Sequence, residues 1–490
     1  MEASLFTKRF DTNVVTDVSE DFTLPDYRPE MRRVIGVYAT PTVDGKYLSG
    51  DELEVDGGVT YTVLYISGDG ELTQTSQTSS YTGKIPVKTD EDRYTVGDMP
   101  LGALVDGVNC RLTGPRKFTL SSRVKLSLMS QRPVDASLKA EIPEGSQLRR
   151  KNETHKTAAV CEVRKNGEVS GEIRERDGMR VVMARGELSL GDVRLGGQNK
   201  KEATVKGEAY VTVLLMSADG EFVTSKGRAP IEEIVGLPEV PRGAELHPVA
   251  FGNVVMIEID PADDGTLNWR MEYDIDLNIM KCLESQVAVD AYLTGVDDRL
   301  QEETILSYVP AAAVNGRLTT SATARLRPEM AYVCSWGSGN VDKCEIGGGR
   351  MSVYGNVDIT VVSAGGGEVI AENVHIPLKY ECEALPDTVF AEDGSMCKRT
   401  SVNVTDINVR VDGDTMNITA ELSIGCIALR TEQITAAVLI VPSADGDAAK
   451  WKGENLIRVY VPDEGECAWD VEKRFKLDRE ATLCGNAYII

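Results

Sequence analysis

The stretch Val59-Thr60-Tyr61-Thr62-Val63-Leu64-Tyr65-Ile66 runs directly into Ser67-Gly68-Asp69-Gly70-Glu71, and this arrangement returns twice. Residues 210–216 precede Ser217-Ala218-Asp219-Gly220-Glu221, and residues 357–362 precede Ser363-Ala364-Gly365-Gly366-Gly367-Glu368. The Gly-Glu pairs begin at 70, 220 and 367, which are 150 and 147 residues apart. A β-branched run that ends in a glycine turn predicts a strand and a hairpin. Its return at domain-length intervals predicts duplicated β domains.

A second hairpin follows the first in each repeat, with its turn at Gly114-Pro115, Asp264-Gly265 and Asp412-Gly413. The strands after these turns alternate between apolar and polar residues, which is typical of half-buried antiparallel strands. The apolar positions are Trp269, Met271, Tyr273, Ile275, Leu277 and Ile279 in the second repeat and Met416, Ile418, Ala420, Leu422 and Ile424 in the third. The first repeat has Phe118, Leu120, Val124, Leu126 and Leu128 around a break at Ser121-Ser122, which we interpret as a bulge.

Two further landmarks repeat. Arg28-Pro29-Glu30-Met31 returns as Arg327-Pro328-Glu329-Met330, and Val134-Asp135-Ala136-Ser137-Leu138 is echoed by Val289-Asp290-Ala291-Tyr292-Leu293. The sequence therefore predicts an all-β fold of three tandem, β-sandwich-like domains of antiparallel sheet. We place them at residues 1–150, 151–310 and 311–450, with joins near 145–152 and 311–316 and a separate C-terminal segment at 451–490.

Composition narrows the function classes. The chain has 490 residues and a formal net charge of −24, which disfavours binding to nucleic-acid phosphates and anionic lipid. No apolar run approaches the ~18 residues of a membrane span, and residues 1–19 lack the apolar core of a signal peptide. We therefore expect synthesis in the cytoplasm. The ten cysteines form no C-x-x-C pair, which favours reduced thiols; Cys334 and Cys344 are the nearest to a pair.

Catalytic signatures are missing, and we expect no enzyme activity, catalytic residue, cofactor or metal. The glycine runs at 347–349 and 365–367 lie between β-patterned segments, which favours hairpin turns over phosphate loops. In so acidic a chain, two adjacent acids such as Asp263-Asp264 are expected by chance. Paired acids can, however, bind calcium or act on glycosidic bonds. Trp336 is either a core or interface residue, which we favour, or an exposed ligand-stacking residue.

The C-terminal segment has a different pattern. Residues 459–462 predict a short strand, and residues 465–475 predict a turn that enters a short helix. This stretch resembles the opening of the LysM module, with Gly465, Trp469, Asp470, Lys473 and Arg474 in register. Glu466-Cys467 replaces the Asp-Thr pair of that pattern, and Leu483 falls where its second helix ends. By this resemblance Ile490 comes too early for the closing strand, so we expect a truncated module. Together with Phe475, the matching residues are our candidate partner-binding site.

The order of the parts resembles the SipL-like family of clostridial spore coat-morphogenesis proteins, through the opening Leu24, Pro25, Pro29 and Glu30, the Gly-Glu hairpins and the tail. The resemblance implies mother-cell synthesis, recruitment to the forespore surface and binding to a coat ATPase. We therefore hypothesise a structural protein that self-associates or tethers other coat or envelope proteins. The N-terminal arm at 5–18 is expected either to self-associate or to complete the first domain. The alternative is a peptidoglycan-binding protein acting through the tail, although the shortened groove predicts no glycan binding. An enzyme with a site near Asp263-Asp264 is a third hypothesis.

Overall fold

A computed structural model describes residues 4–87, 99–174, 178–197, 201–239, 243–262, 265–385, 396–443, 459–478, 480–484 and 486–489. Strands account for 81% of the structure and helix for 2%. This confirms the predicted all-β class. Within the described residues, no helix has the length and apolar character needed to cross a bilayer.

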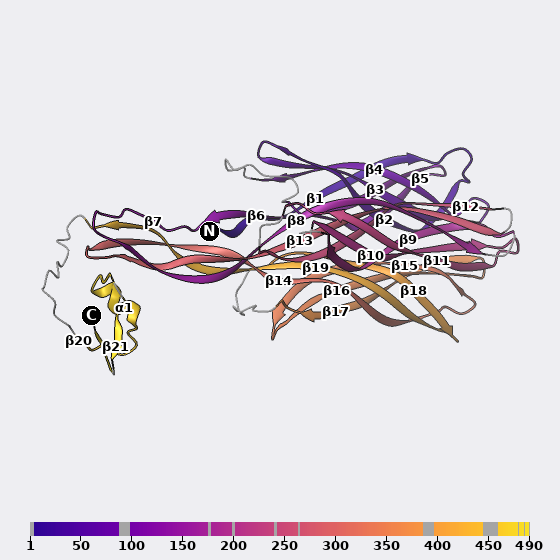
Figure 1. Ribbon diagram of the computed structural model, residues 1–490. Helices are drawn as coiled ribbons and strands as arrows, with labels where there is room; N and C mark the ends of the chain where they lie inside the picture. The colour runs from indigo at the N-terminus through magenta and orange to yellow at the C-terminus, as the bar shows by residue number, and fades with distance from the viewer. Residues whose placement is uncertain are drawn as a thin grey trace.

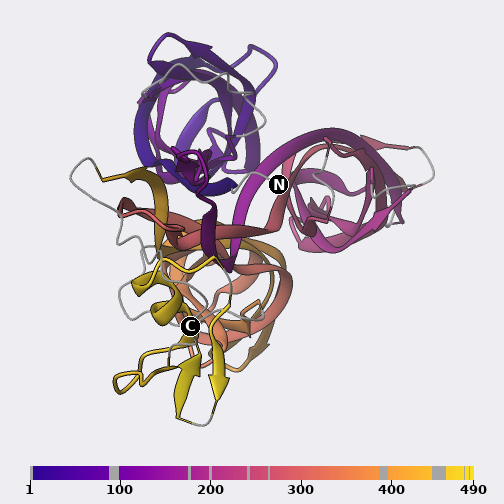
Figure 2. The same cartoon turned by 60° about the vertical axis from the view of Figure 1, so that its left-hand side comes forward.

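The first unit consists of two three-stranded antiparallel sheets that face each other around one core. Its strands are β1 (Ser4–Thr23), β2 (Met31–Ser49), β3 (Glu52–Ser67), β4 (Leu72–Pro86), β5 (Leu101–Gly114) and β6 (Lys117–Asp135). The sheet orders are β1-β6-β5 and β2-β3-β4. Because β1 lies beside β4 and β2 beside β5, the two sheets together enclose the core as a ring (Figure 2).

The same strand order is used twice more. The second unit has β8 (Leu148–Arg174), β9 (Arg180–Gly196), β10 (Glu202–Met216), β11 (Phe222–Gly236), β12 (Glu245–Pro261) and β13 (Thr266–Leu293). The third has β14 (Asp298–Arg325), β15 (Ala331–Gly347), β16 (Arg350–Gly365), β17 (Glu368–Glu383), β18 (Met396–Asp412) and β19 (Thr415–Pro442). Their sheets are β8-β13-β12 with β9-β10-β11, and β14-β19-β18 with β15-β16-β17. β14 also pairs with β1 at Ser307 and Thr7, so β18-β19-β14 of the third unit continues into β1-β6-β5 of the first unit as one sheet. Each unit has a hydrophobic core of its own.

The repeated turns are hairpins, as predicted. Gly70 and Gly220 take positive φ angles of 87° and 81°, the conformation for which glycine is needed. In both turns the serine that ends the strand accepts a hydrogen bond from the backbone of the Gly-Glu glutamate: Ser67 Oγ from Glu71 at 3.0 Å, and Ser217 Oγ from Glu221 at 3.1 Å. The two copies therefore share their local chemistry as well as their sequence.

The predicted bulge at Ser121-Ser122 is wrong. Ser122 keeps the inward phase of β6 and is buried, where its hydroxyl lies 2.7 Å from the Tyr61 hydroxyl. The apparent break is a polar side chain in an inward position. The irregularity lies on the facing strand, between Val105 and Val108 of β5, where Gly107 has a φ of 89°.

Four strands extend beyond the units. β8, β13, β14 and β19 have 27 or 28 residues each, and their far parts form a projection, which we call the stalk (residues 148–156, 284–293, 298–307 and 432–442; Figure 1). β7 (Lys139–Ala140) pairs with β19 there. Of the expected joins, 145–152 spans the start of β8 and 311–316 lies inside β14. The N-terminal arm pairs with β6 and completes the first unit.

The three units surround a common centre (Figure 2). When β3, β10 and β16 are aligned on Gly57, Gly207 and Gly355, the cross-strand pairs Tyr38–Thr62, Arg185–Thr212 and Trp336–Thr360 occupy matching positions on β2, β9 and β15. Residues from these strands form one buried cluster between the units, which includes Leu64, Met183, Leu214, Val333 and Trp336. The molecule is therefore a pseudo-threefold arrangement within one chain.

The C-terminal segment lies beside the far end of the stalk (Figure 1). It contains β20 (Val459–Tyr460), α1 (Ala468–Arg474), β21 (Thr482–Cys484) and β22 (Ala487–Ile489), with the sheet order β20-β22-β21. The strand and helix lie where they were predicted. Leu483 is in β21 instead of a second helix, and β22 pairs antiparallel with β20, so the segment closes its own sheet despite the expected truncation.

Candidate functional site

A buried charged cluster joins all three units. Glu162 of β8 is almost completely buried, and its carboxylate accepts hydrogen bonds from Lys46 Nζ of the first unit at 2.6 Å and from Arg399 of the third unit. The backbone N–H of Leu101 adds a contact at 3.2 Å. A buried carboxylate needs this degree of pairing because desolvation of an unpaired charge costs several kcal/mol.

Arg399 extends the cluster to a second carboxylate. Its guanidinium donates to Asp276 Oδ2 at 2.8 Å and lies 4.4 Å from the centre of the Phe251 ring. Arg164 donates to the other oxygen of Asp276 at 2.7 Å. Burial opposes ionisation of Asp276, but the two guanidiniums outweigh it and hold the pKa of this carboxyl below its ordinary value. The cluster therefore works as an electrostatic lock between the units.

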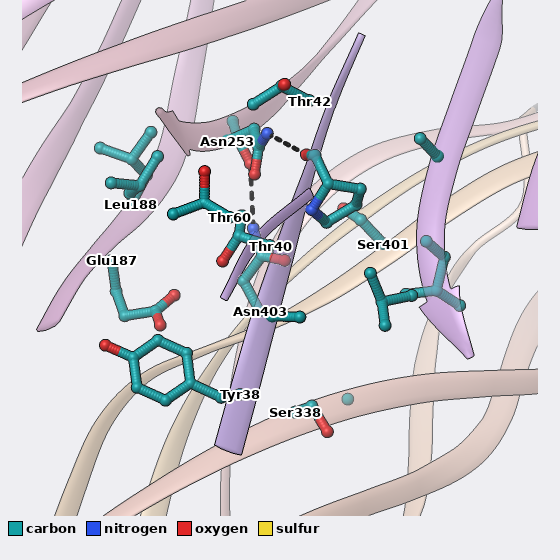
Figure 3. A pocket seen from close by; sticks show the side chains of 18 of the residues that line it. Tyr38, Thr40, Thr42, Thr60, Glu187, Leu188, Asn253, Ser338, Ser401 and Asn403 are labelled. Atoms are coloured by element: carbon teal, nitrogen blue, oxygen red, sulfur yellow. Dashed lines mark hydrogen bonds between the residues drawn. The ribbon is translucent and has the colours of Figure 1, made fainter. Parts of the chain in front are cut away.

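A cleft of about 1640 Å³ runs between the units next to this cluster. Hydroxyl and amide side chains from all three units line it, among them Thr40, Thr42, Thr60, Asn253, Ser338, Ser401 and Asn403 (Figure 3). Asn253 and Asn403 also bridge neighbouring units, since they donate to the carbonyls of Pro41 at 2.6 Å and Gly252 at 3.3 Å. Such a surface can hydrogen-bond a polar ligand.

Tyr38 and Glu187 lie at one side of the cleft (Figure 3). Burial raises the pKa of both groups. Arg185 lies 5.5 Å from the Tyr38 ring centre, pairs with Glu187 and donates to the Gly337 carbonyl at 2.8 Å. These side chains therefore fasten β2, β9 and β15 to one another.

The tip of the stalk binds the C-terminal segment. The Asp290 carboxylate accepts hydrogen bonds from Trp469 Nε1 at 2.8 Å and from Lys473 Nζ at 2.5 Å. The Trp469 ring packs against Tyr292, with ring centres 5.3 Å apart. Two of the candidate partner-binding residues thus face the protein's own stalk.

Further polar contacts strengthen this docking. Lys476 Nζ lies 2.7 Å from Asp298 Oδ2, and the Tyr292 hydroxyl donates to the Leu477 carbonyl at 2.9 Å. Arg149 Nη2 lies 3.3 Å from the buried Glu472 carboxylate. The segment is therefore held on a complementary surface.

The remaining candidate residues have local roles. Gly465 has a φ of 87° in the turn before α1, and the Asp470 carboxylate accepts from the Cys467 backbone at 2.8 Å as part of a capping box. The Phe475 ring packs edge-on against Tyr460 at 5.1 Å. Arg474 is half exposed and pairs with Asp463 at 3.6 Å and with Glu466 at 3.3 Å.

The structure also places the other tryptophan, cysteine and glycine positions that the sequence singled out. Trp336 is buried at the interface between units, and Cys334 and Cys344 lie on one strand as free thiols. The glycine runs at 347–349 and 365–367 form hairpin turns. Asp263-Asp264 lies outside the described residues. Within the described ranges, no three His, Cys, Asp or Glu side chains gather closely enough to hold a metal ion.

Sequence reasoning missed the lock residues Lys46, Glu162, Asp276 and Arg399. Asp276 and Arg399 come from segments 123 residues apart, and each lies in an ordinary alternating pattern. Asp290 lies in the repeated Val-Asp-Ala sequence, which draws attention to this position. The repeat does not predict that Asp290 binds the C-terminal segment. Comparison of the chain with family models, with curated proteins and with solved structures gives no match.

Proposed function

We propose that this chain is a non-enzymatic assembly protein of a multiprotein layer, of the spore-coat or spore-envelope type that its resemblance to the SipL-like family suggests. In this proposal the three-unit body is a rigid scaffold, and the stalk carries the C-terminal segment to the point of contact with other molecules. By the same resemblance, a coat ATPase and other coat proteins are the expected partners.

One observation carries the proposal: the C-terminal segment has large apolar side chains exposed on both edges of its sheet. Val459, Val461 and Leu483 are 66%, 69% and 59% exposed. β20 and β21 are the edge strands of this sheet. An open edge with apolar neighbours supports pairing with a strand of another chain.

The docking at Asp290 supports a protein-binding role over a glycan-binding role. Trp469 is the side chain best suited to stacking on a sugar, and its ring is packed on Tyr292. In this proposal, a partner protein binds the edge strands β20 and β21 of the segment.

Light scattering after size-exclusion chromatography, from micromolar to near-millimolar concentration, tests the proposal. We expect mass to increase with concentration or on addition of a coat protein. Leu483→Asp and Val459→Lys should reduce this increase, whereas Val15→Asp, at an exposed position of the first unit, should not. A strict monomer at all concentrations that binds no coat protein contradicts the proposal, and sedimentation with purified sacculi would favour the glycan alternative.

A further inference from the structure

Sulfur-bearing side chains gather at one end of the core of the third unit. Cys344 lies on β15, Met351 on β16 and Cys426 on β19; Met351 and Cys426 belong to one buried cluster, and the partly buried Cys344 packs against it. The Cys426 sulfur lies 3.9 Å from Met351 Sδ, and Cys344 is near enough to raise the pKa of the Cys426 thiol. The hairpin of β15 and β16 and the distant strand β19 thus bring three soft donor atoms together.

The other two units serve as an internal comparison. Strand β16 aligns with β3 and β10 so that Gly355 matches Gly57 and Gly207, and the three strands share one burial pattern. In this register Met351 corresponds to Leu53 and Ala203, and Cys426 corresponds to Leu128 and Leu277. Cys344, which pairs with Val353, corresponds to Lys46 and Val193. Leu53, Ala203, Leu128 and Leu277 are buried. The fold therefore accepts ordinary core residues at these positions, and packing alone does not require the sulfur atoms of the third unit.

We propose that Cys344, Met351 and Cys426 form a binding site for Cu(I). Thiolate and thioether sulfurs are the ligands that select this ion. With metal–sulfur distances of about 2.3 Å, three sulfurs in a trigonal plane lie about 4 Å apart. The 3.9 Å between Cys426 and Met351 already matches that spacing.

The surroundings suit a monovalent, reduced ion. Cys426 and Met351 are buried, whereas Cys344 is only partly buried and gives the ion a path of approach. Binding replaces the two thiol protons, so that two thiols and Cu(I) give a bis-thiolate complex of charge −1 and two released protons. Lys398 lies beside Cys344 and can balance that charge. Zn(II) normally takes four ligands, and the described residues offer no third Cys, His or carboxylate within reach.

The test uses the full-length, reduced protein with the exposed Cys467 and Cys484 changed to serine. Cu(I) is titrated without oxygen against bathocuproine disulfonate, and X-ray absorption reports the donor atoms. We expect one tightly held equivalent with sulfur neighbours only. Cys344→Val, Met351→Leu and Cys426→Leu each introduce a residue that another unit has at the same position, so they should keep the fold while each weakens binding at least tenfold.

Cys334→Val is the matched control, because Cys334 is equally buried but lies in the cluster between the units. Its affinity for Cu(I) should equal that of the background protein. Unchanged affinity in Cys344→Val or Cys426→Leu, nitrogen or oxygen donors in the bound complex, or preferential binding of Zn(II) would each overturn the proposal. These outcomes are independent of whether the protein assembles into a layer.

Discussion

Trp336 of the third unit lies directly against Gly36 of the first unit. A Cβ added to Gly36 would come within 2.5 Å of the indole carbon Cζ2. The same indole lies 6.2 Å from the Tyr38 ring, measured between ring centres. This contact closes the arrangement of three units, because it joins the first unit to the last.

Gly36→Ala should therefore destabilise the protein. The added methyl group has no space unless the indole moves, and overpacking of this kind costs about 1–3 kcal/mol. Urea unfolding followed by circular dichroism measures the change. Gly68→Ala is the control, since a Cβ there meets nothing within 4 Å, and an equal loss in both variants would contradict the explanation.

Arg399→Leu should lower the free energy of unfolding more than Gly36→Ala does. It leaves the carboxylates of Glu162 and Asp276 without their shared partner, and breaking a buried pair in this way costs about 3–5 kcal/mol. Thermal and chemical unfolding report the loss. Lys84→Ala removes an exposed pair with Glu52 and Glu54 and should change stability little; similar effects at both sites would show that burial is not decisive.

Acid should weaken the lock through Asp276. Because the folded-state pKa of this carboxyl is lowered, its contribution is complete above the unfolded-state pKa of about 3.9 and is lost as pH falls through the lower folded-state pKa. The unfolding free energy should therefore decrease below about pH 4. Asp276→Asn should show a shallower decrease over this range, and an identical pH profile would argue against this assignment.

Asp290→Ala should release the C-terminal segment from the stalk while the three units stay folded. The substitution removes the acceptor shared by Trp469 and Lys473. Hydrogen exchange should become faster across residues 466–478 and unchanged in β10 and β16. Glu464→Gln, at an exposed position of the same segment, should leave exchange as it is.

The thiol of Cys344 should be more reactive than the other buried cysteines. The hydrogen bond from Cys426, with help from Lys398, lowers the pKa of Cys344 to about 7, whereas burial raises that of Cys334 to about 12. Alkylation by iodoacetamide should rise between pH 6 and 8 at Cys344 and remain slow at Cys334. Peptide mass spectrometry measures both sites, and Lys398→Met should shift the Cys344 profile to higher pH.

The local structure was predictable because hairpins carry their own signals. The glycines at 70, 220 and 367 and the alternation after Lys117, Thr266 and Thr415 lie where the structure has turns and paired strands. The contacts between units were not predictable, because they pair unlike residues. Trp336 needs the absence of a side chain at Gly36, and Arg399 needs two carboxylates of another unit. In the tail, the pattern around Trp469 predicted the helix but not the direction that the indole faces, which Asp290 determines.

The pseudo-threefold arrangement has a consequence that a symmetric trimer could not reach. In a trimer of identical chains, the positions of Tyr38, Arg185 and Trp336 would hold one residue type, so the centre would contain three phenols, three guanidiniums or three indoles. Joining the three copies in a single chain lets an indole and a guanidinium both pack against one phenol ring. The same freedom allows one copy to exchange aliphatic core residues for sulfur while its two sisters keep theirs. Because the three copies lie in one polypeptide, each copy can keep the residues that its fold requires and change other residues independently of the other two.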